Sequence, residues 1–197
     1  PPKADNGAVL RRGTIRFGLG AIKGVGEKAV GAIIEARERG GAFRNLFDFC
    51  ERVDLTAVNK GTIEALICAG AFDATGGMRR ALCDAAERAM AVGVATQRDR
   101  RSGQMALFGG EESSPAAESA PPMLTTAEWP EAEMLAREKA VLGFYITKHP
   151  LAKYERLLDA CATATTADLA RYKDGDEVIV GGIVTNVRMV TTRTGRN

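Results

Sequence analysis

The sequence predicts a mainly α-helical protein, on three observations. Apolar residues recur at helical spacing on both sides of a glycine-rich turn at residues 24–26. The pattern returns 33 residues later, at 57–59. Beyond residue 102 it gives way to a polar stretch, further helical segments and a valine-rich run. We therefore expect a helical domain over 1–97, a linker over 98–127, a helical connecting segment over 128–172 and the start of a β-domain over 173–197.

The first repeat, residues 19–34, has the pattern of a helix-hairpin-helix. Its two helical arms share an apolar face formed by Leu19, Ile22, Val25, Ala29, Val30, Ile33 and Ile34. Gly24 and Gly26 can adopt positive φ and carry no side chain, so a phosphate can approach the N–H groups that open the second arm. Lys23 and Lys28 add positive charge. The repeat therefore predicts contact with a nucleic-acid backbone, although such turns are also common structural connectors.

The second repeat replaces both hairpin glycines. Val58 aligns with the central valine of the first hairpin, and Asn59 aligns with its last glycine. Asn tolerates the left-handed conformation better than most residues, so Asn59 fits a hairpin of the same shape. Lys60 supplies a further cation. We expect the two repeats to pack pseudo-symmetrically and to present two hairpins to duplex DNA, with the second contact left open.

Helical periodicity continues in order along the chain. Before the first repeat, Asn6-Gly7 predicts a short β-hairpin. Helices follow at about 27–38, 46–53, 60–70 and 78–97, and glycine or aspartate turn signals separate them. A helix returns at about 130–142, with Pro130 in its first turn and Gly143 at its stop. Another helix follows Pro150, and residues 178–190 predict one or two strands.

Charge and composition separate the two halves of the chain. Residues 1–101 hold 17 Lys or Arg and 12 Asp or Glu, whereas residues 102–197 hold 10 and 13. The first half is therefore the one suited to phosphate. Residues 102–136 contain no Lys or Arg and are rich in Ser, Pro and Ala, which is typical of a linker. No apolar run approaches the ~20 residues of a membrane span, so we expect a cytoplasmic protein without a membrane partner.

The cysteines do not indicate a metal site or a disulfide framework. The chain has four cysteines without a CxxC spacing, and one histidine, His149, accompanies them. Cys50, Cys68 and Cys83 fall on helical patterns, where we expect them to act as small buried apolar residues. The chain begins Pro1-Pro2 without an initiator Met, and we expect it to be a piece of a longer protein.

Four runs, in this order, resemble the C-terminal portion of the bacterial DNA polymerase III alpha family: Phe17–Gly26, Leu46–Cys50, Ala69–Asp73 and Leu142–Leu151. The resemblance covers essentially the whole chain, weakly in the linker. It implies a tandem helix-hairpin-helix domain, and strands near the end that open an OB-fold. It also implies a replicative DNA polymerase whose metal-binding palm aspartates precede this segment. We therefore expect no catalytic residue, metal site or cofactor here, and Mg²⁺ in the parent polymerase.

The linker contains a segment similar to the short peptides that bind bacterial sliding clamps. It contributes Gln104 and Met105, followed by the apolar pair Leu107 and Phe108. In such peptides the apolar pair fills a cleft and Gln reaches a polar edge. The alternative is that these residues end the helix at 78–97 and pack on its core. The resemblance implies double-stranded DNA and the sliding clamp (beta subunit) as partners, and other holoenzyme subunits through regions outside this segment.

Three other interpretations stay open. The error-prone alpha-subunit relative shares the hairpins, and the clamp-like segment Gln104–Phe108 favours the replicative subunit without deciding between them. A helix-hairpin-helix adaptor would bind the clamp but not DNA. A base-excision glycosylase would use Lys28 as nucleophile with Asp48 downstream, although no pocket-forming scaffold is evident around them.

Overall fold

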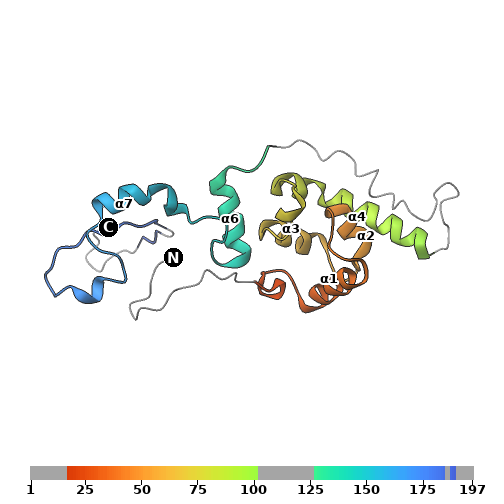
Figure 1. The fold of residues 1–197 in the computed structure, drawn as a ribbon, viewed down its shortest axis with the longest axis horizontal. Helices are drawn as coiled ribbons and strands as arrows, with labels where there is room; N and C mark the ends of the chain where they lie inside the picture. Colours follow the sequence, from red (N-terminus) through yellow and green to blue (C-terminus); the bar gives the residue numbers. More distant parts are fainter. Residues whose placement is uncertain (1–16, 102–126, 185–186, 190–197) are drawn as a thin grey trace. The chain divides into compact units, whose positions relative to one another are not determined.

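The computed structural model describes residues 17–101, 127–184 and 187–189 (Figure 1). Within these ranges all regular secondary structure is helical, which confirms the predicted fold class in outline. The chain divides into two compact units, Pro1–Tyr145 and Ile146–Asn197. The β-hairpin predicted near Asn6 lies outside the described residues.

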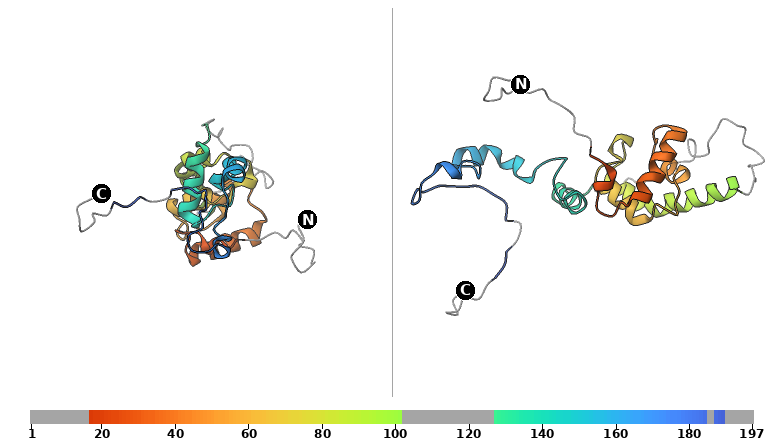
Figure 2. Two further views of the ribbon diagram at one scale, coloured as in Figure 1. Left: turned by 90° about the vertical axis from the view of Figure 1, so that its left-hand side faces the viewer. Right: turned by 90° about the horizontal axis from the view of Figure 1, so that it is seen from below.

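The first unit contains five α-helices among its described residues, close to the predicted ranges. They are α1 (Glu27–Gly40), α2 (Leu46–Arg52), α3 (Lys60–Cys68), α4 (Arg79–Arg101) and α6 (Glu131–Leu142), with 3₁₀ turns η1 (Leu19–Ala21) and η2 (Asp73–Thr75). Figures 1 and 2 show the C-terminal end of α4 projecting beyond the other helices of this unit. The α4 helix runs four residues past its predicted end.

The core lies where α2, α3 and α4 pack together. Its most buried side chains include Leu46, Val53, Val58, Ile63, Leu66, Ile67 and Leu82. At Gly93, α4 approaches α2 so closely that a Cβ atom would collide with the backbone carbonyl of Cys50. Gln97 Nε2 then donates to the carbonyls of Cys50 and Val53, at 3.0 and 2.8 Å, and satisfies the C-terminal end of α2. The close crossing therefore depends on glycine.

The helix after the linker packs back on this core. Glu138 of α6 is fully buried and accepts a hydrogen bond from Arg79 Nη1 at 3.0 Å. Just before α6, the Glu128 carboxylate accepts from the backbone N–H groups of Arg79 and Arg80, at 2.7 and 3.0 Å, and so caps the first turn of α4. Leu142, at the end of α6, joins the apolar core.

One side chain of the first repeat departs from the predicted apolar face. Ile34 is 37% exposed, whereas its neighbour Ile33 is 4% exposed. Successive residues of a helix point about 100° apart, so only one of this adjacent pair can face the core squarely.

The second unit is described through 3₁₀ turns η3 (Pro150–Tyr154) and η4 (Leu169–Arg171) and the short helix α7 (Glu155–Cys161). His149 caps η3 by accepting from the Leu151 N–H. Ile179 exchanges hydrogen bonds with Thr163, but residues 173–184 and 187–189 contain no strand. The predicted start of an OB-fold is therefore not confirmed, and Val184 and Val187 are 77% and 78% exposed. Strands need neighbours to satisfy their backbone.

Candidate nucleic-acid interface

The first hairpin is a tight turn anchored by two buried side chains. Ile22 and Val25 are 4% and 6% exposed, and the Val25 N–H donates to the Ile22 carbonyl at 3.1 Å. Between them Gly24 has φ +91°, a conformation that side chains disfavour, as predicted. The arm before the turn is the short 3₁₀ turn η1.

Contacts from two other helices fix the backbone of this hairpin. The Thr62 hydroxyl of α3 donates to the Gly24 carbonyl at 3.2 Å. The Lys23 N–H donates to the Val141 carbonyl in the last turn of α6, at 2.8 Å. The hairpin is therefore held in place from both sides.

The helix that follows the first hairpin begins without a side-chain cap. Gly26 is the N-cap of α1, with φ −81° and ψ 162°, and as a glycine it has no side chain to accept a hydrogen bond from the first turn. The prediction of positive φ at Gly26 is wrong, because an N-cap residue takes the extended conformation. The first N–H groups of an α-helix have no partner inside the helix and attract anions. Lys23 and Lys28 are exposed beside this opening.

The second hairpin aligns with the first residue by residue, but a side chain caps the helix that follows it. Asn59 is the N-cap of α3, and its Oδ1 accepts from the Thr62 N–H at 2.9 Å and lies 3.2 Å from the Thr62 hydroxyl oxygen. Its φ is −90°, so the predicted left-handed conformation is wrong for the same reason as at Gly26. Asn59 thus accepts a hydrogen bond from an N–H group in the first turn of α3, whereas Gly26 has no side chain to do the same for α1. Both N-caps and both buried valines, Val25 and Val58, agree with the 33-residue repeat.

The cation predicted for the second hairpin is paired within the chain. Lys60 Nζ lies 3.0 Å from the Glu87 carboxylate of α4, on the surface. The hydrogen bond and the charge of Glu87 raise the pKa of Lys60. A surface pair of this kind contributes little to stability, but it places a negative charge beside the hairpin.

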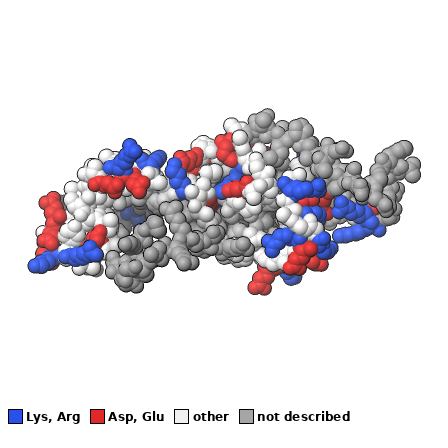
Figure 3. All heavy atoms as spheres, in the orientation of Figure 1, with Lys and Arg blue, Asp and Glu red and all other residues white. Residues whose placement is uncertain are grey.

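The two hairpins line one cleft together with α6. Its walls include Lys23, Gly24, Asn59, Thr62 and Arg137. The part played by Arg137 and Val141 had no sequence signal, because α6 follows the predicted linker and its docking is a long-range contact. On the face shown in Figure 3, Lys and Arg alternate with Asp and Glu over the helical unit. No broad basic surface covers that face.

The remaining candidate residues divide into two groups. Gln104, Met105, Leu107 and Phe108 lie outside the described residues. Asp48 is 3% exposed and is held by Arg44 and Arg52, at 3.0 and 2.9 Å. This pairing leaves Asp48 unsuited to the catalytic role in the glycosylase interpretation.

In the described ranges no group of three His, Cys, Asp or Glu side chains could hold a metal ion. No helix there has the length and apolar composition of a membrane span.

Comparison with known proteins gives a consistent result. A family model described as a helix-hairpin-helix motif matches residues 3–82. The DNA polymerase III subunit alpha of Vibrio cholerae is 38% identical over 97% of this chain, that of Pseudomonas aeruginosa 40% over 93%, and that of Escherichia coli K12 35% over 99%. The chain spans only 16–17% of the length of these relatives. Over nearly its whole length, the chain therefore belongs to the DNA polymerase III alpha subunit family, as one segment homologous to part of that subunit.

Proposed function

We propose that this segment binds the backbone of duplex DNA without sequence preference, mainly through the first hairpin. A phosphate would be bound by the open N–H groups at the start of α1, and Lys23 and Lys28 would supply charge. The uncapped Gly26 carries this proposal, because the corresponding amide of the second hairpin is already bonded to Asn59. The helix-hairpin-helix match over residues 3–82 supports it.

The proposal is tested by giving the first hairpin the cap of the second. A Cβ atom added at Gly26 would meet no atom within 4 Å, and the φ of −81° suits any residue. Gly26→Asp should therefore keep the fold and strengthen the helix start slightly. Its carboxylate would occupy the open amides and repel phosphate, so duplex affinity should fall at least about tenfold, which corresponds to ~1.4 kcal/mol. Binding is measured by fluorescence anisotropy with duplexes of several sequences.

Two matched variants separate the causes. Gly26→Asn adds the cap without the charge and should weaken binding less than Gly26→Asp. Lys60→Ala removes a cation that already pairs with Glu87 and should change affinity less than about twofold. With the unaltered chain, log K against log salt should have a slope of about −2 to −4, for two to four neutralised phosphates. A flat salt response, or unchanged binding by Gly26→Asp, would exclude this interface and favour the adaptor.

We further propose that the parent protein is a replicative DNA polymerase of the bacterial cytoplasm, with Mg²⁺ held by residues outside this segment. The segment would grip duplex DNA behind the active site. Other holoenzyme subunits would bind elsewhere on the parent. The identity of 35–40% to the named alpha subunits supports this proposal. We also propose that residues 173–197 begin an OB-fold, as the family resemblance implies.

We propose that Gln104, Met105, Leu107 and Phe108 tether the segment to the sliding clamp. They follow the C-terminal end of α4, which projects from the helical unit (Figure 2). Two buried apolar side chains contribute about 1.5–3 kcal/mol each, less the cost of ordering a linker, so micromolar affinity is expected. Clamp and duplex contacts together would raise the effective concentration of each.

Leu107→Ala combined with Phe108→Ala should abolish clamp binding in a pull-down with purified clamp. Duplex affinity and the melting temperature should stay as in the unaltered chain, because the hairpins and core are elsewhere. Retained clamp binding would exclude the motif. Unfolding of the double variant would instead place the pair in the helical core.

A further inference from the structure

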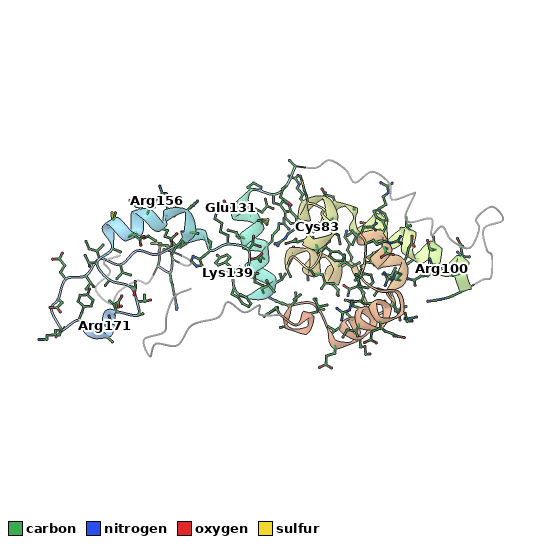
Figure 4. All side chains as sticks on the ribbon, in the orientation of Figure 1. Cys83, Arg100, Glu131, Lys139, Arg156 and Arg171 are labelled. Atoms are coloured by element: carbon green, nitrogen blue, oxygen red, sulfur yellow. The ribbon has the colours of Figure 1, made fainter. Side chains whose placement is uncertain are left out.

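A second cleft of the first unit lies at the other end of α1 from the first hairpin. Its walls include the C-terminal part of α1, α2 and the C-terminal part of α4, and its volume is about 780 Å³. Arg100, labelled in Figure 4, lies in that part of α4. Five arginines line this cleft, which we call the arginine cleft: Arg39, Arg44, Arg52, Arg100 and Arg101.

The acidic residues that α2 contributes to the cleft lie at its floor. The side chains of Asp48 and Glu51 are both only 4% exposed. Arg44 Nη2 lies 3.0 Å from the Asp48 carboxylate, and Arg100 Nη2 lies 3.7 Å from the Glu51 carboxylate. These two arginine side chains are 52% and 54% exposed. The cleft therefore has buried carboxylates below and guanidinium groups facing solvent.

The rim of the cleft carries a positive excess. Its two other carboxylates belong to exposed residues. Glu35 pairs with Arg39 at 3.3 Å, and Asp54 accepts from the Thr56 N–H and hydroxyl. Arg39 and Arg101 are exposed as well. The exposed charged residues of the cleft are therefore four arginines and two carboxylates, because Arg52, Asp48 and Glu51 belong to the floor.

Arg44 and Arg100 are suited to bind a further anion. A guanidinium has five N–H donors, and each of the two ion pairs engages one terminal nitrogen. A buried carboxylate also restricts the side chain before a ligand arrives, which lowers the entropic cost of binding. The planar fork of arginine matches the oxygens of a phosphate. Arg52 differs, because it donates to three backbone carbonyls and so supports the floor.

We propose that the arginine cleft binds the phosphate backbone of duplex DNA, as a second contact besides the first hairpin. This inference rests on the proposed function and adds a second site to it. Helix α1 has 14 residues, so its ends are roughly 21 Å apart. Each strand of a duplex carries a phosphate about every 3.4 Å, so about a dozen base pairs extend beyond that distance. The helix-hairpin-helix match in the same unit favours phosphate over an acidic peptide.

The test combines Arg44→Gln with Arg100→Gln in the full 197-residue chain and measures binding to a duplex of about 20 base pairs by fluorescence anisotropy. Affinity should fall at least about fivefold, and the slope of log K against log salt should become less negative by about 1, because at least one phosphate contact is lost. Arg37→Gln combined with Arg88→Gln is the matched control. It removes two exposed charges that do not line the cleft and should change affinity less than about twofold.

A second pair of changes keeps the inference testable if the first pair affects folding. Arg39→Gln combined with Arg101→Gln alters only exposed side chains, so the melting temperature should stay as in the unaltered chain. Duplex affinity should fall about threefold, because these arginines add charge at the rim. Circular dichroism establishes which variants are folded.

The inference is overturned if every folded cleft variant keeps the affinity and salt slope of the unaltered chain, or if the control pair weakens binding as much as the cleft pairs. It is also overturned if the cleft variants lose binding to polyglutamate but keep their duplex affinity, because the cleft would then accept an acidic peptide. Gly26→Asp separates this inference from the proposed function. If Gly26→Asp weakens duplex binding and the cleft variants do not, only the arginine cleft is excluded.

Discussion

At the scale of single residues, a buried carboxylate organises the start of α2. The Asp48 N–H donates to the Asn45 side chain, and the Asp48 carboxylate accepts from the Arg44 N–H at 3.0 Å, so side chain and backbone cap each other. Burial by itself raises the pKa of Asp48. Hydrogen bonds from Arg44 and Arg52 outweigh burial and hold that pKa below its usual value of 3.8.

Replacing Asp48 with Asn should lower the free energy of unfolding by about 1–3 kcal/mol at pH 7, because two cationic partners lose their charged acceptor. The pKa is lowered on folding, so the carboxylate stabilises the protein fully above its unfolded pKa, and this contribution is lost as pH falls below about 3.8. Urea unfolding at pH 7 and pH 3 measures both effects. The difference between the two proteins should shrink at pH 3.

Glu35→Gln is the matched control for this prediction. Glu35 pairs with Arg39 on the same helical unit, but both side chains are more than 60% exposed, at 69% and 67%. Its loss should cost about 0.5 kcal/mol or less. If the two variants lowered the free energy of unfolding equally, the burial of Asp48 would contribute nothing to stability.

At the scale of elements, a buried ion pair joins α6 to the other helices of the first unit. Arg79 of α4 contacts both Asp73 and Glu138, and Glu138 is fully buried on α6. The hydrogen bond to Asp73 and then that to Glu138 raise the pKa of Arg79 against the effect of burial, so the group stays charged. Because Val141 of α6 also accepts from Lys23, the position of α6 bears on the first hairpin.

Replacing Glu138 with Ala should destabilise the first unit by about 3 kcal/mol, because the buried guanidinium of Arg79 loses a carboxylate partner. Amide exchange should show α6 opening before α2, α3 and α4. Duplex affinity should also fall several-fold, because the Lys23 amide loses its fixed acceptor. Glu133→Gln, in the exposed pair with Arg137, is the control and should change neither property measurably. Unchanged exchange in α6 after Glu138→Ala would contradict this account of its docking.

At the scale of the whole chain, the first unit contains the entire apolar core of the hairpin domain. The buried members of that core run from Ile22 to Leu142, all within Pro1–Tyr145. The linker leaves from the C-terminal end of α4, and Glu128 beyond it caps the N-terminal end of the same helix. The residues described before and after the proposed clamp-binding segment therefore belong to one unit.

A chain of residues 1–145 should fold and bind duplex DNA like the full chain. Its main melting transition should lie within about 3 °C of that of residues 1–197, which is under ~1 kcal/mol for a unit of this size. Duplex affinity and salt slope should agree within about twofold. Calorimetry and anisotropy measure these values. Failure of 1–145 to fold would mean that the second unit stabilises the core.

The sequence by itself determined the local structure and the family. Apolar periodicity predicted the helices at 27–40, 46–52 and 60–68 within a few residues, and the 33-residue repeat aligned the two N-caps, Gly26 and Asn59. These signals are local, because an amphipathic face and a cap depend on residues within a few positions of each other. The four family runs lie in order along the chain, so they needed no knowledge of the fold.

Only the tertiary structure decided what lies beside each hairpin. The Asn59 side chain caps α3 through Thr62, three residues away, but Lys60 reaches Glu87, 27 residues away. The docking of α6 brings Glu138 to Arg79 across 59 residues. Such contacts depend on how the helices pack, and packing joins residues whose separation along the chain no periodic pattern encodes. The sequence therefore specified two hairpins that differ in their N-caps, and the packing of α3, α4 and α6 placed Glu87 and the end of α6 beside them.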